Sequence, residues 1–452
     1  MKQHIGDECI PAVKVGEEVT IGQCIGMPAP GSFAVPVHSS ISGRVTDIKP
    51  VQLPTGVTSR AVFITSDRKR TFHESIRPRQ DVNISASSVM GIIRDAGVVG
   101  LGGEGLPAIA KLNRAKKLKV NTLLVNCLQS EPYAACDYLR IGEYADYIIM
   151  GAVAMAGACG VKVINILISK EHKYEITALR SAMERSFSKY SGYAFNFVYM
   201  RQRFPQGYYR LVARALYGVN LSEKDTLEEK CHAVMFNCST IYACWEAIAD
   251  GMPLVSRVIS ISTENGIKHN VIAPIGTPVS ELLDTVNGIS STSKRIIWGN
   301  CLTGIELSDP DNTPVIKTTS GICVITRREI LRNPCISCGR CTDSCPMTLE
   351  PAILYSLLKR GETQKAEYFN VTRCMSCGAC SYVCPSNLDL TETIASYAAS
   401  KKRGTSYAYR YGHDIADIGS VSLLEGYTED DKSPEVHDKN AINLPFEGGK
   451  LI

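Results

Sequence analysis

Residues 335–346 read Cys-Ile-Ser-Cys-Gly-Arg-Cys-Thr-Asp-Ser-Cys-Pro, and residues 374–385 repeat the pattern as Cys-Met-Ser-Cys-Gly-Ala-Cys-Ser-Tyr-Val-Cys-Pro. Each copy has the spacing C-x2-C-x2-C-x3-C-P, which wraps [4Fe–4S] clusters in bacterial-type ferredoxins. Three thiolates at three-residue intervals share one tight loop, so the fourth iron of each cube needs a thiolate from another direction. The two runs therefore predict two clusters and one-electron transfer.

The two runs are expected to exchange their fourth ligands, because in two-cluster ferredoxins the last cysteine of each run binds the other cluster. One cluster is then assigned to the first three cysteines of the first run and the last of the second. The other cluster takes the remaining four. The two predicted ligand sets are Cys335, Cys338, Cys341 and Cys384, and Cys374, Cys377, Cys380 and Cys345.

Zinc and disulfides are the alternatives for so many cysteines. Structural zinc commonly uses two separated C-x2-C pairs rather than this doubled run. Disulfides require an oxidising compartment. The ten other cysteines have irregular spacing, which is typical of buried free thiols in a reducing cytosol.

Composition limits the class of protein. The chain has 452 residues, 44% hydrophobic and 21% charged, with a formal net charge of +4, which is ordinary for a globular protein of about three domains. Lysine and arginine are dispersed, so no nucleic-acid partner is expected.

The N-terminus shows no signal-peptide pattern. The apolar stretch 147–161 is too short for a membrane span and predicts a buried helix. We expect a cytoplasmic protein, free or peripheral on the cytoplasmic membrane face.

Changes of pattern along the chain predict a multidomain α+β fold. In residues 1–85, apolar and polar residues alternate over short segments separated by glycines, which predicts short strands and resembles a barrel-sandwich hybrid. A lipoyl or biotinyl carrier needs a lysine at the hairpin tip, but the corresponding turn, 38–42, has none, so a structural module is favoured. Residues 86–249 alternate helical and strand patterns, which predicts an α/β domain.

The second half of the chain divides in the same way. Residues 250–325 return to strands and resemble a β-grasp module of the soluble-ligand-binding type. Residues 326–400 are expected to form a helical, bacterial-ferredoxin-type domain that holds both clusters. The polar tail, 401–452, is expected to be mobile.

A glycine-rich loop, Gly-Leu-Gly-Gly-Glu-Gly at 100–105, contains G-x-G-x-x-G. A Rossmann loop should follow a strand, with an acidic residue ending the next strand. Here the preceding segment, 88–96, has a helical pattern, and the next strand, 122–125, ends at Asn126. A standard dinucleotide fold is therefore not expected, although the backbone N–H groups of the loop can still cradle a phosphate.

A family resemblance rests on four segments: 100–111, 126–133, 204–207 and the two cysteine runs. Together they resemble RnfC, the C subunit of the Rnf electron-transport complex, over about residues 3–400. That family is similar to the flavin-carrying NADH-dehydrogenase subunit of respiratory complex I. The start of the chain resembles a shortened branch, the electron-transfer proteins associated with D-proline reductase in amino-acid-fermenting clostridia. The cobalamin reductases of propanediol microcompartments are also similar.

The resemblance implies FMN bound by the glycine loop, with NADH stacked on it. Residues at matching positions would hold the phosphate side of the flavin: Gly100, Gly102, Gly103, Gly105 and Lys111. Others would face the flavin or the nicotinamide: Asn126, Glu131, Asp137, Asn237 and Thr240. For Asn237 and Thr240 the alternative is a strand-to-helix cap.

Three positions depart from the family pattern. Glu104 stands where the family has alanine, and an acid there would repel a phosphate. Gln129 and Tyr209 replace acids that the family places near the nucleotide. These departures favour a chain whose flavin and NADH pocket has degenerated.

Four functions stay open at this point. The first is an NADH-dependent oxidoreductase that passes electrons through FMN and the two clusters to a partner reductase, such as D-proline reductase. The second is a non-enzymatic relay that uses the clusters alone. The third is a component of a membrane Rnf-type ferredoxin:NAD oxidoreductase. The fourth is a scaffold whose clusters are structural.

Overall fold

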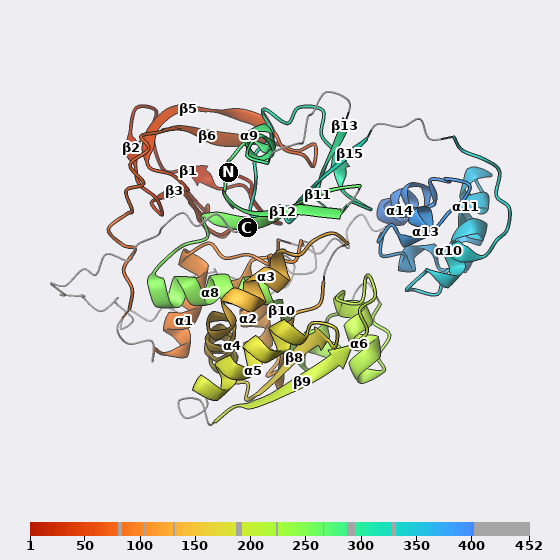
Figure 1. Cartoon of the computed structure of the whole chain (residues 1–452), viewed down its shortest axis with the longest axis horizontal. Coiled ribbons are helices and arrows are strands. Elements are labelled where there is room, and N and C mark those ends of the chain that lie inside the picture. Colours follow the sequence, from red (N-terminus) through yellow and green to blue (C-terminus); the bar gives the residue numbers. More distant parts are fainter. Residues whose placement is uncertain are drawn as a thin grey trace.

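The computed structural model describes residues 1–79, 84–103, 105–129, 132–186, 192–222, 225–264, 266–286, 294–299, 301–326 and 331–401. Four bodies follow one another along the chain: a small β body, an α/β body, a second β body and a helical body (Figure 1). The tail expected to be mobile lies outside the described residues beyond Lys401.

Two small antiparallel sheets form the N-terminal body, as the barrel-sandwich prediction requires. The first sheet contains β1 (Ile10–Pro11), β3 (Cys24–Met27) and β4 (Val37–His38), and the second contains β2 (Glu18–Val19), β5 (Gly43–Gln52) and β6 (Thr58–Ser66). Inward-facing residues of both sheets, such as Ile25 and Val45, share one core. His38 is half-buried on β4.

A four-stranded parallel sheet forms the centre of the α/β body, in the order β10-β7-β8-β9. Its strands are β7 (Thr122–Asn126), β8 (Val163–Ser169), β9 (Ala194–Met200) and β10 (Ala233–Asn237). Leu123 and Val125 of β7 point to one core and Leu124 to another, because successive side chains of a strand face opposite sides. Both faces are covered, which explains the continuous apolar pattern of these strands.

Helices cover the two faces unequally. The larger core carries α1 (Ala86–Asp95), α2 (Ala108–Lys117), α3 (Cys136–Glu143), α4 (Ala145–Cys159), α5 (Lys173–Ser186) and α8 (Cys238–Asp250). The smaller core carries α6 (Tyr209–Tyr217) and α7 (Leu227–Lys230). The buried helix expected over 147–161 is α4, which ends at Gly160 in a left-handed conformation before β8. The glycine loop lies between α1 and α2, so the structure confirms that it does not follow a strand.

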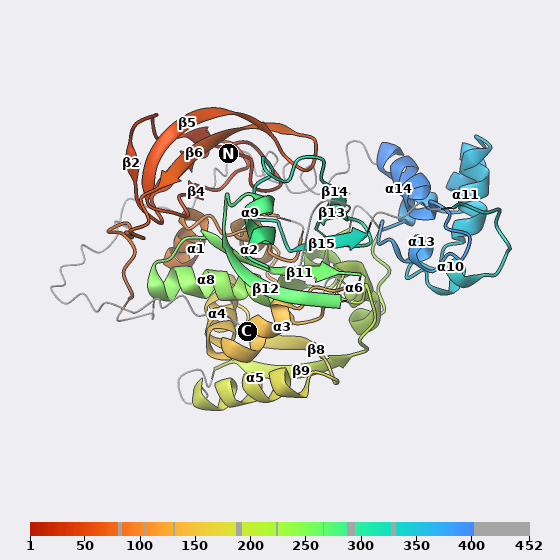
Figure 2. The same ribbon diagram turned by 45° about the horizontal axis from the view of Figure 1, so that its top comes forward.

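The second β body is a five-stranded mixed sheet in the order β12-β11-β15-β13-β14. Its strands are β11 (Ser256–Thr263), β12 (Gly266–Pro274), β13 (Lys294–Trp298), β14 (Ile305–Glu306) and β15 (Gly321–Thr326). Helix α9 (Val279–Asp284) packs on its core through Val279, Leu282 and Leu283. Figure 2 shows this sheet between the N-terminal β body and the α/β body.

The helical body contains both cysteine runs. Its elements are α10 (Arg340–Asp343), α11 (Pro351–Lys359), α12 (Thr363–Tyr368), a 3-10 turn (Val371–Arg373), α13 (Ala379–Tyr382) and α14 (Leu390–Lys401). Positive φ angles recur at corresponding places of the two runs, at Ser337 and Ser376 (53° and 57°) and at Gly339 and Gly378 (77° and 82°). Both pairs are 39 residues apart (376 − 337 and 378 − 339). The two runs therefore share one backbone conformation, with a short helix starting after the glycine.

The ten cysteines outside the runs are mostly buried, as expected of free thiols. The expectation is wrong for Cys24 and Cys301, which are half-buried. Cys24 is the first residue of β3, and its sulfur contacts that of Met27, the exposed last residue of the strand.

A buried lysine joins three of the bodies. Lys317, in the second β body, is 0% exposed, and its ammonium donates to the carbonyl oxygens of Pro36 (2.8 Å) and Gly97 (2.7 Å). Its backbone N–H donates to Oε1 of Gln3 at 3.0 Å. Among the described residues, the ammonium is hydrogen-bonded to these two backbone carbonyls, and burial lowers the pKa of Lys317 to about 8.

This lysine should make stability depend on pH. Between about pH 8 and about pH 10.5 the unfolded chain binds a proton that the folded chain has lost, so the free energy of unfolding should rise with pH. Lys317→Met abolishes this contribution. Relative to the variant, the wild-type protein should therefore gain about 1.4 kcal/mol per pH unit within that window. Anaerobic urea unfolding followed by circular dichroism checks this. The exposed-lysine variant Lys117→Met should show a constant difference from wild type, and an equally constant difference for Lys317→Met would contradict the account.

Candidate redox centres and nucleotide site

The eight cysteines of the two runs line two cavities in the helical body. One cavity is lined by Cys335, Cys338, Cys341 and Cys384, together with residues of α11 and the segment before α14. The other is lined by Cys345, Cys374, Cys377 and Cys380. The structure thus brings each last cysteine to the opposite run, in the grouping expected from the spacing. Within the described ranges no three Cys, His, Asp or Glu side chains converge on a position for a single metal ion.

The chemistry of these cavities fits an iron–sulfur cluster. Burial and then the neighbouring thiols, including that of Cys345, raise the pKa of Cys377 to about 11. The positive charge of a bound metal centre favours the thiolate and would lower this pKa, so that the sulfur could serve as a ligand. Backbone N–H groups already point at the sulfurs: those of Ser376 and Leu349 donate to Cys374 and Cys345 at 3.4 Å. Such hydrogen bonds tune the potential of a bound cluster.

The two cavities differ in their surroundings. Cys345 and Cys374 belong to an apolar cluster that also contains Tyr208 and Leu211, at the start of α6. A Cβ on Gly378 would stand 2.8 Å from Cβ of Leu302, so this run also touches the second β body. The other cavity faces outward, because every residue from 331 to 340 is exposed, including Cys335 and Cys338. Figure 1 shows the helical body attached on one side only.

The carboxyl ends of β7 and β10 lie side by side in the α/β body, and we call the region that they border the crevice. From β7 the chain proceeds through β8 and β9 on one side and returns to β10 on the other, which makes this the topological switch point of the sheet. Ligands of open parallel sheets bind in such a crevice. Asn126 and Asn237, two of the predicted flavin residues, end these strands as register partners.

The glycine loop closes one wall of this crevice. The backbone N–H of Leu101 donates to Oγ1 of Thr240 at 2.9 Å, and Arg257 donates to the carbonyl of Leu101 at 3.1 Å. A Cβ on Gly102 would stand 3.4 Å from Cβ of Asn237, so the absence of a side chain keeps the space beside α8 open. Three of the predicted residues, Gly102, Asn237 and Thr240, therefore meet at the N-terminus of α8.

A buried carboxylate holds two polar side chains beside the crevice in place. Asp137, 6% exposed, accepts hydrogen bonds from Nδ2 of Asn237 (2.8 Å) and Oγ of Ser239 (2.6 Å). Oδ1 of Asn237 accepts from the N–H of Ser239 at 2.9 Å, which makes Asn237 the N-cap of α8. The cap alternative is thus confirmed for Asn237. Thr240 instead holds the glycine loop.

Asn126 connects β7 to the segment before α6. Its Nδ2 donates to the carbonyl of Gly207 at 3.0 Å, and its Oδ1 accepts from the N–H of Leu128 at 3.1 Å. A Cβ on Gly207 would stand 3.4 Å from Nδ2 of Asn126, so a glycine allows this close approach. Asn126 therefore shapes the crevice through its own hydrogen bonds.

The other predicted residues are placed as follows. Gly100 and Gly105 close the glycine loop on itself, since the N–H of Gly105 donates to the carbonyl of Gly100 at 3.2 Å. Gly103 and Gly105 have φ angles of 100° and 68°, which favour glycine. Lys111 donates to the carbonyl of Met235 at 2.6 Å, so its role toward a flavin phosphate stays a prediction. Glu104 and Glu131 lie outside the described residues.

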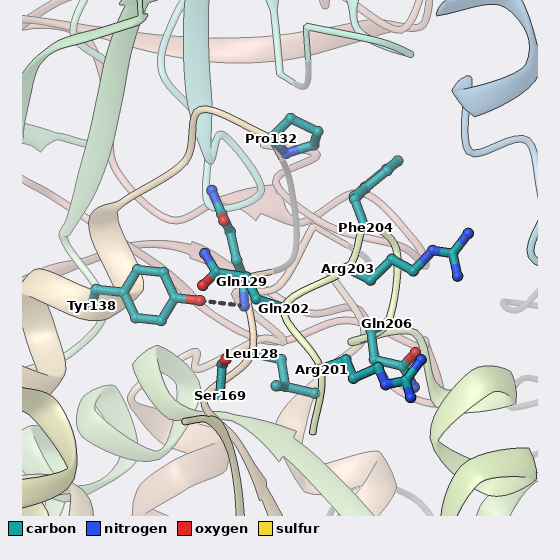
Figure 3. Close-up of a pocket in the computed structure, with 10 residues that line it drawn as sticks. All are labelled: Leu128, Gln129, Pro132, Tyr138, Ser169, Arg201, Gln202, Arg203, Phe204 and Gln206. Atoms are coloured by element: carbon teal, nitrogen blue, oxygen red, sulfur yellow. Dashed lines mark hydrogen bonds between the residues drawn. The ribbon is translucent and has the colours of Figure 1, made fainter. Parts of the chain in front are cut away.

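Apart from the two cysteine cavities, a cavity of about 180 Å³ lies in the α/β body beyond the ends of β7, β8 and β9. Its lining residues, shown in Figure 3, are Leu128, Gln129, Pro132, Tyr138, Ser169, Arg201, Gln202, Arg203, Phe204 and Gln206. The N–H of Gln129 donates to the hydroxyl of Tyr138 at 3.0 Å. Tyr209 packs against the core under α6. The signal that could have revealed this cavity is the Arg-Gln-Arg stretch at 201–203, directly after the strand 194–200.

Comparisons with protein families match three parts of the chain. Residues 1–69 match the RnfC barrel-sandwich hybrid domain, 93–246 the Nuo51 FMN-binding domain and 328–385 the 4Fe–4S dicluster domain. These modules define an electron-transfer protein that combines an FMN-binding type of domain with a two-cluster iron–sulfur domain. The predicted barrel-sandwich, flavin-type and dicluster modules are confirmed.

Curated relatives identify the family. The chain is 30% identical to the C subunit of the ion-translocating oxidoreductase complex of Rhodobacter capsulatus, over 81% of this chain and 70% of the relative. It is 31% identical to the C subunit of the proton-translocating ferredoxin:NAD(+) oxidoreductase complex of Clostridium ljungdahlii, over 81% and 79%. The chain belongs to the RnfC family, the C subunits of these complexes.

Solved structures share the fold. The chain superposes on a chain of the crystal structure of an NAD+-reducing [NiFe]-hydrogenase in the H2-reduced state, with a TM-score of 0.53 and 12% identity, covering 74% of this chain and 63% of that chain. The air-oxidised form gives a TM-score of 0.54 at 15% identity, covering 74% and 61%. Less than two thirds of the hydrogenase chain is therefore represented. Among the helices that the structure describes, none has the length and apolar character needed to cross a bilayer.

Proposed function

We propose that this chain transfers electrons from NADH to a partner redox protein, with FMN and two [4Fe–4S] clusters as carriers. The observation that carries the proposal is that the cavity of Cys345 and Cys374 packs against the start of α6. The start of α6 directly follows Gly207, whose carbonyl is hydrogen-bonded to Asn126 at the crevice. A flavin-type crevice and an iron–sulfur cavity are thereby neighbours in one chain.

The crevice offers a defined set of residues to FMN. Gly102 leaves space beside Asn237, and Asp137 holds Asn237 and Ser239 in place at the N-terminus of α8. Bound FMN supplies the ability to take two electrons from a hydride donor and to release them one at a time. Of the positions that depart from the family pattern, Gln129 lines the neighbouring cavity and Tyr209 packs against the core under α6.

The surroundings of the two cavities support an order for the clusters. The cluster of Cys345, Cys374, Cys377 and Cys380 would lie nearer the α/β body, because that cavity packs against Tyr208 and Leu211. The cluster of Cys335, Cys338, Cys341 and Cys384 would lie at the exposed surface of residues 331–340. A partner protein would exchange electrons there.

The partner itself is a proposal from the relatives. The related proteins of Clostridium ljungdahlii and Acetobacterium woodii carry names of ferredoxin:NAD(+) oxidoreductase complexes. The partner could be another subunit of such a complex or a separate reductase, such as D-proline reductase. In both cases electrons would pass through the same exposed cluster. The relay is common to both.

An anaerobic absorbance titration tests the proposal. The cluster-loaded protein is supplied with FMN and titrated with NADH, and the final state is compared with that reached by dithionite. We expect NADH to bleach the flavin band and the broad cluster band to the dithionite level. Full bleaching by dithionite with none by NADH would refute NADH as the donor and leave the clusters as a relay fed by another protein.

A further inference from the structure

The cavity beyond β7, β8 and β9 is lined by two cations and by no carboxylate of the described residues. Arg201 and Arg203 follow β9 and are exposed. Among the described residues, neither guanidinium has a carboxylate partner within 4.0 Å. Two such groups on one short segment repel each other unless an anion lies between them or water screens them.

The remaining polar groups of the lining are neutral. Gln129, Gln202 and Gln206 contribute amides, and Ser169 contributes a hydroxyl that donates to Glu171. Glu171 itself does not line the cavity. The cavity therefore offers guanidinium and amide donors, which suit a phosphate bound through two parallel hydrogen bonds.

The location of the cavity connects it to the crevice. Gln129 lies three residues after Asn126, and Gln206 precedes Gly207, whose carbonyl is bonded to Asn126. The ring of Tyr138 lines the cavity and stacks on His172 with ring centroids 3.6 Å apart. Figure 3 shows Tyr138 on one side and the loop with Arg201, Arg203 and Phe204 on the other. The volume of about 180 Å³ is below the ~300 Å³ at which whole ligand pockets begin, so it suits one part of a dinucleotide.

We propose that Arg201 and Arg203 form an anion subsite in this cavity that binds a phosphate group of the nicotinamide nucleotide. The proposal rests on the proposed function, because it takes the electron donor to be such a nucleotide. Two phosphates share this chemistry: the pyrophosphate, present in NADH and NADPH alike, and the 2′-phosphate, present only in NADPH. Arginine recognises a 2′-phosphate, where an acidic residue would bind the free ribose hydroxyl of NADH.

Calorimetric titration with nucleotide fragments tests the subsite without any electron transfer. The probes are adenosine, 5′-AMP, ADP and 2′,5′-ADP, added to the cluster-loaded full chain. The subsite predicts that at least one of the two diphosphates binds about tenfold or more tightly than adenosine. Tighter binding of 2′,5′-ADP than of ADP assigns the 2′-phosphate, and the reverse assigns the pyrophosphate. Equal affinity of all four probes, or no binding of any, would overturn the proposal.

Matched variants connect the affinity to the two arginines. Arg201→Ala/Arg203→Ala should weaken the tighter diphosphate at least about tenfold and leave adenosine unchanged. Arg214→Ala, an exposed arginine on α6 outside the cavity, should change neither. Undiminished binding by the double variant would also overturn the subsite. Failure of the subsite is separate from failure of the relay, because the NADH and dithionite titration reads electrons and this one reads only binding.

Discussion

Replacing Cys345 with alanine should remove the same cluster as replacing Cys374, although the two residues belong to different runs. Cys345 lies in the cavity of Cys374, Cys377 and Cys380 and not in that of its own run. A [4Fe–4S] cube that loses one of its four thiolates is destabilised or lost. Each single variant should therefore retain about half of the wild-type iron.

Double variants test which cysteines bind the same cluster. Cys345→Ala/Cys374→Ala should keep the iron content of either single variant, because both changes act on one cluster. Cys345→Ala/Cys335→Ala should lose nearly all iron, because the changes act on different clusters. Electron paramagnetic resonance of the dithionite-reduced proteins should give one spectrum for Cys345→Ala and Cys374→Ala and another for Cys335→Ala. The opposite pattern, with Cys345 matching Cys335, would contradict exchange of ligands between the runs.

Gly102→Ala should separate nucleotide-driven from chemical reduction of the clusters. The added Cβ stands at an ordinary contact distance of 3.4 Å from Asn237, and Gly102 does not need a positive φ, so the fold accepts the change. The methyl group nevertheless occupies the space that the glycine keeps open in the crevice. We expect FMN affinity to fall by about tenfold or more, which corresponds to about 1.4 kcal/mol. Dithionite should still reduce both clusters fully.

Gly192→Ala is the matched control, because a Cβ at Gly192 meets nothing within 4 Å. It should bind FMN like the wild-type protein, as measured by quenching of flavin fluorescence. Unchanged FMN affinity in Gly102→Ala would place the flavin elsewhere. Loss of iron in Gly102→Ala would show that the variant acts through the fold and not through the crevice.

The spacing of residues within short segments predicted the cysteine-rich cavities, the strands of the β bodies and the buried helix α4. The doubled cysteine run, together with the ligand exchange known from two-cluster ferredoxins, predicted how the eight cysteines are grouped in the two cavities. Alternation predicted the β bodies, and the apolar run at 147–161 predicted α4. The domain boundaries, at 85, 249, 325 and 400, stay predictions.

Contacts between distant residues could not be predicted from one sequence. Lys317 was not singled out, since its carbonyl partner on Pro36 is 281 residues away in the chain. Lys111 was assigned to a phosphate by resemblance, whereas its amine bonds to Met235 of β10. Arg201 and Arg203 stand out in the sequence, but the cavity beside them lies where three parallel strands end, and the order of those strands could not be predicted from the sequence.

Rapid mixing of the FMN-loaded, cluster-loaded protein with NADH under anaerobic conditions tests the central claim, that flavin and clusters act in one chain. The account predicts that the flavin band bleaches first and that the cluster band follows with a lag. At an FMN concentration that saturates the wild-type protein but not the variant, Gly102→Ala should show both phases with reduced amplitude. Cluster bleaching that is as fast without FMN as with it, or flavin bleaching that never reaches the clusters, would contradict a relay from the crevice to the cysteine cavities.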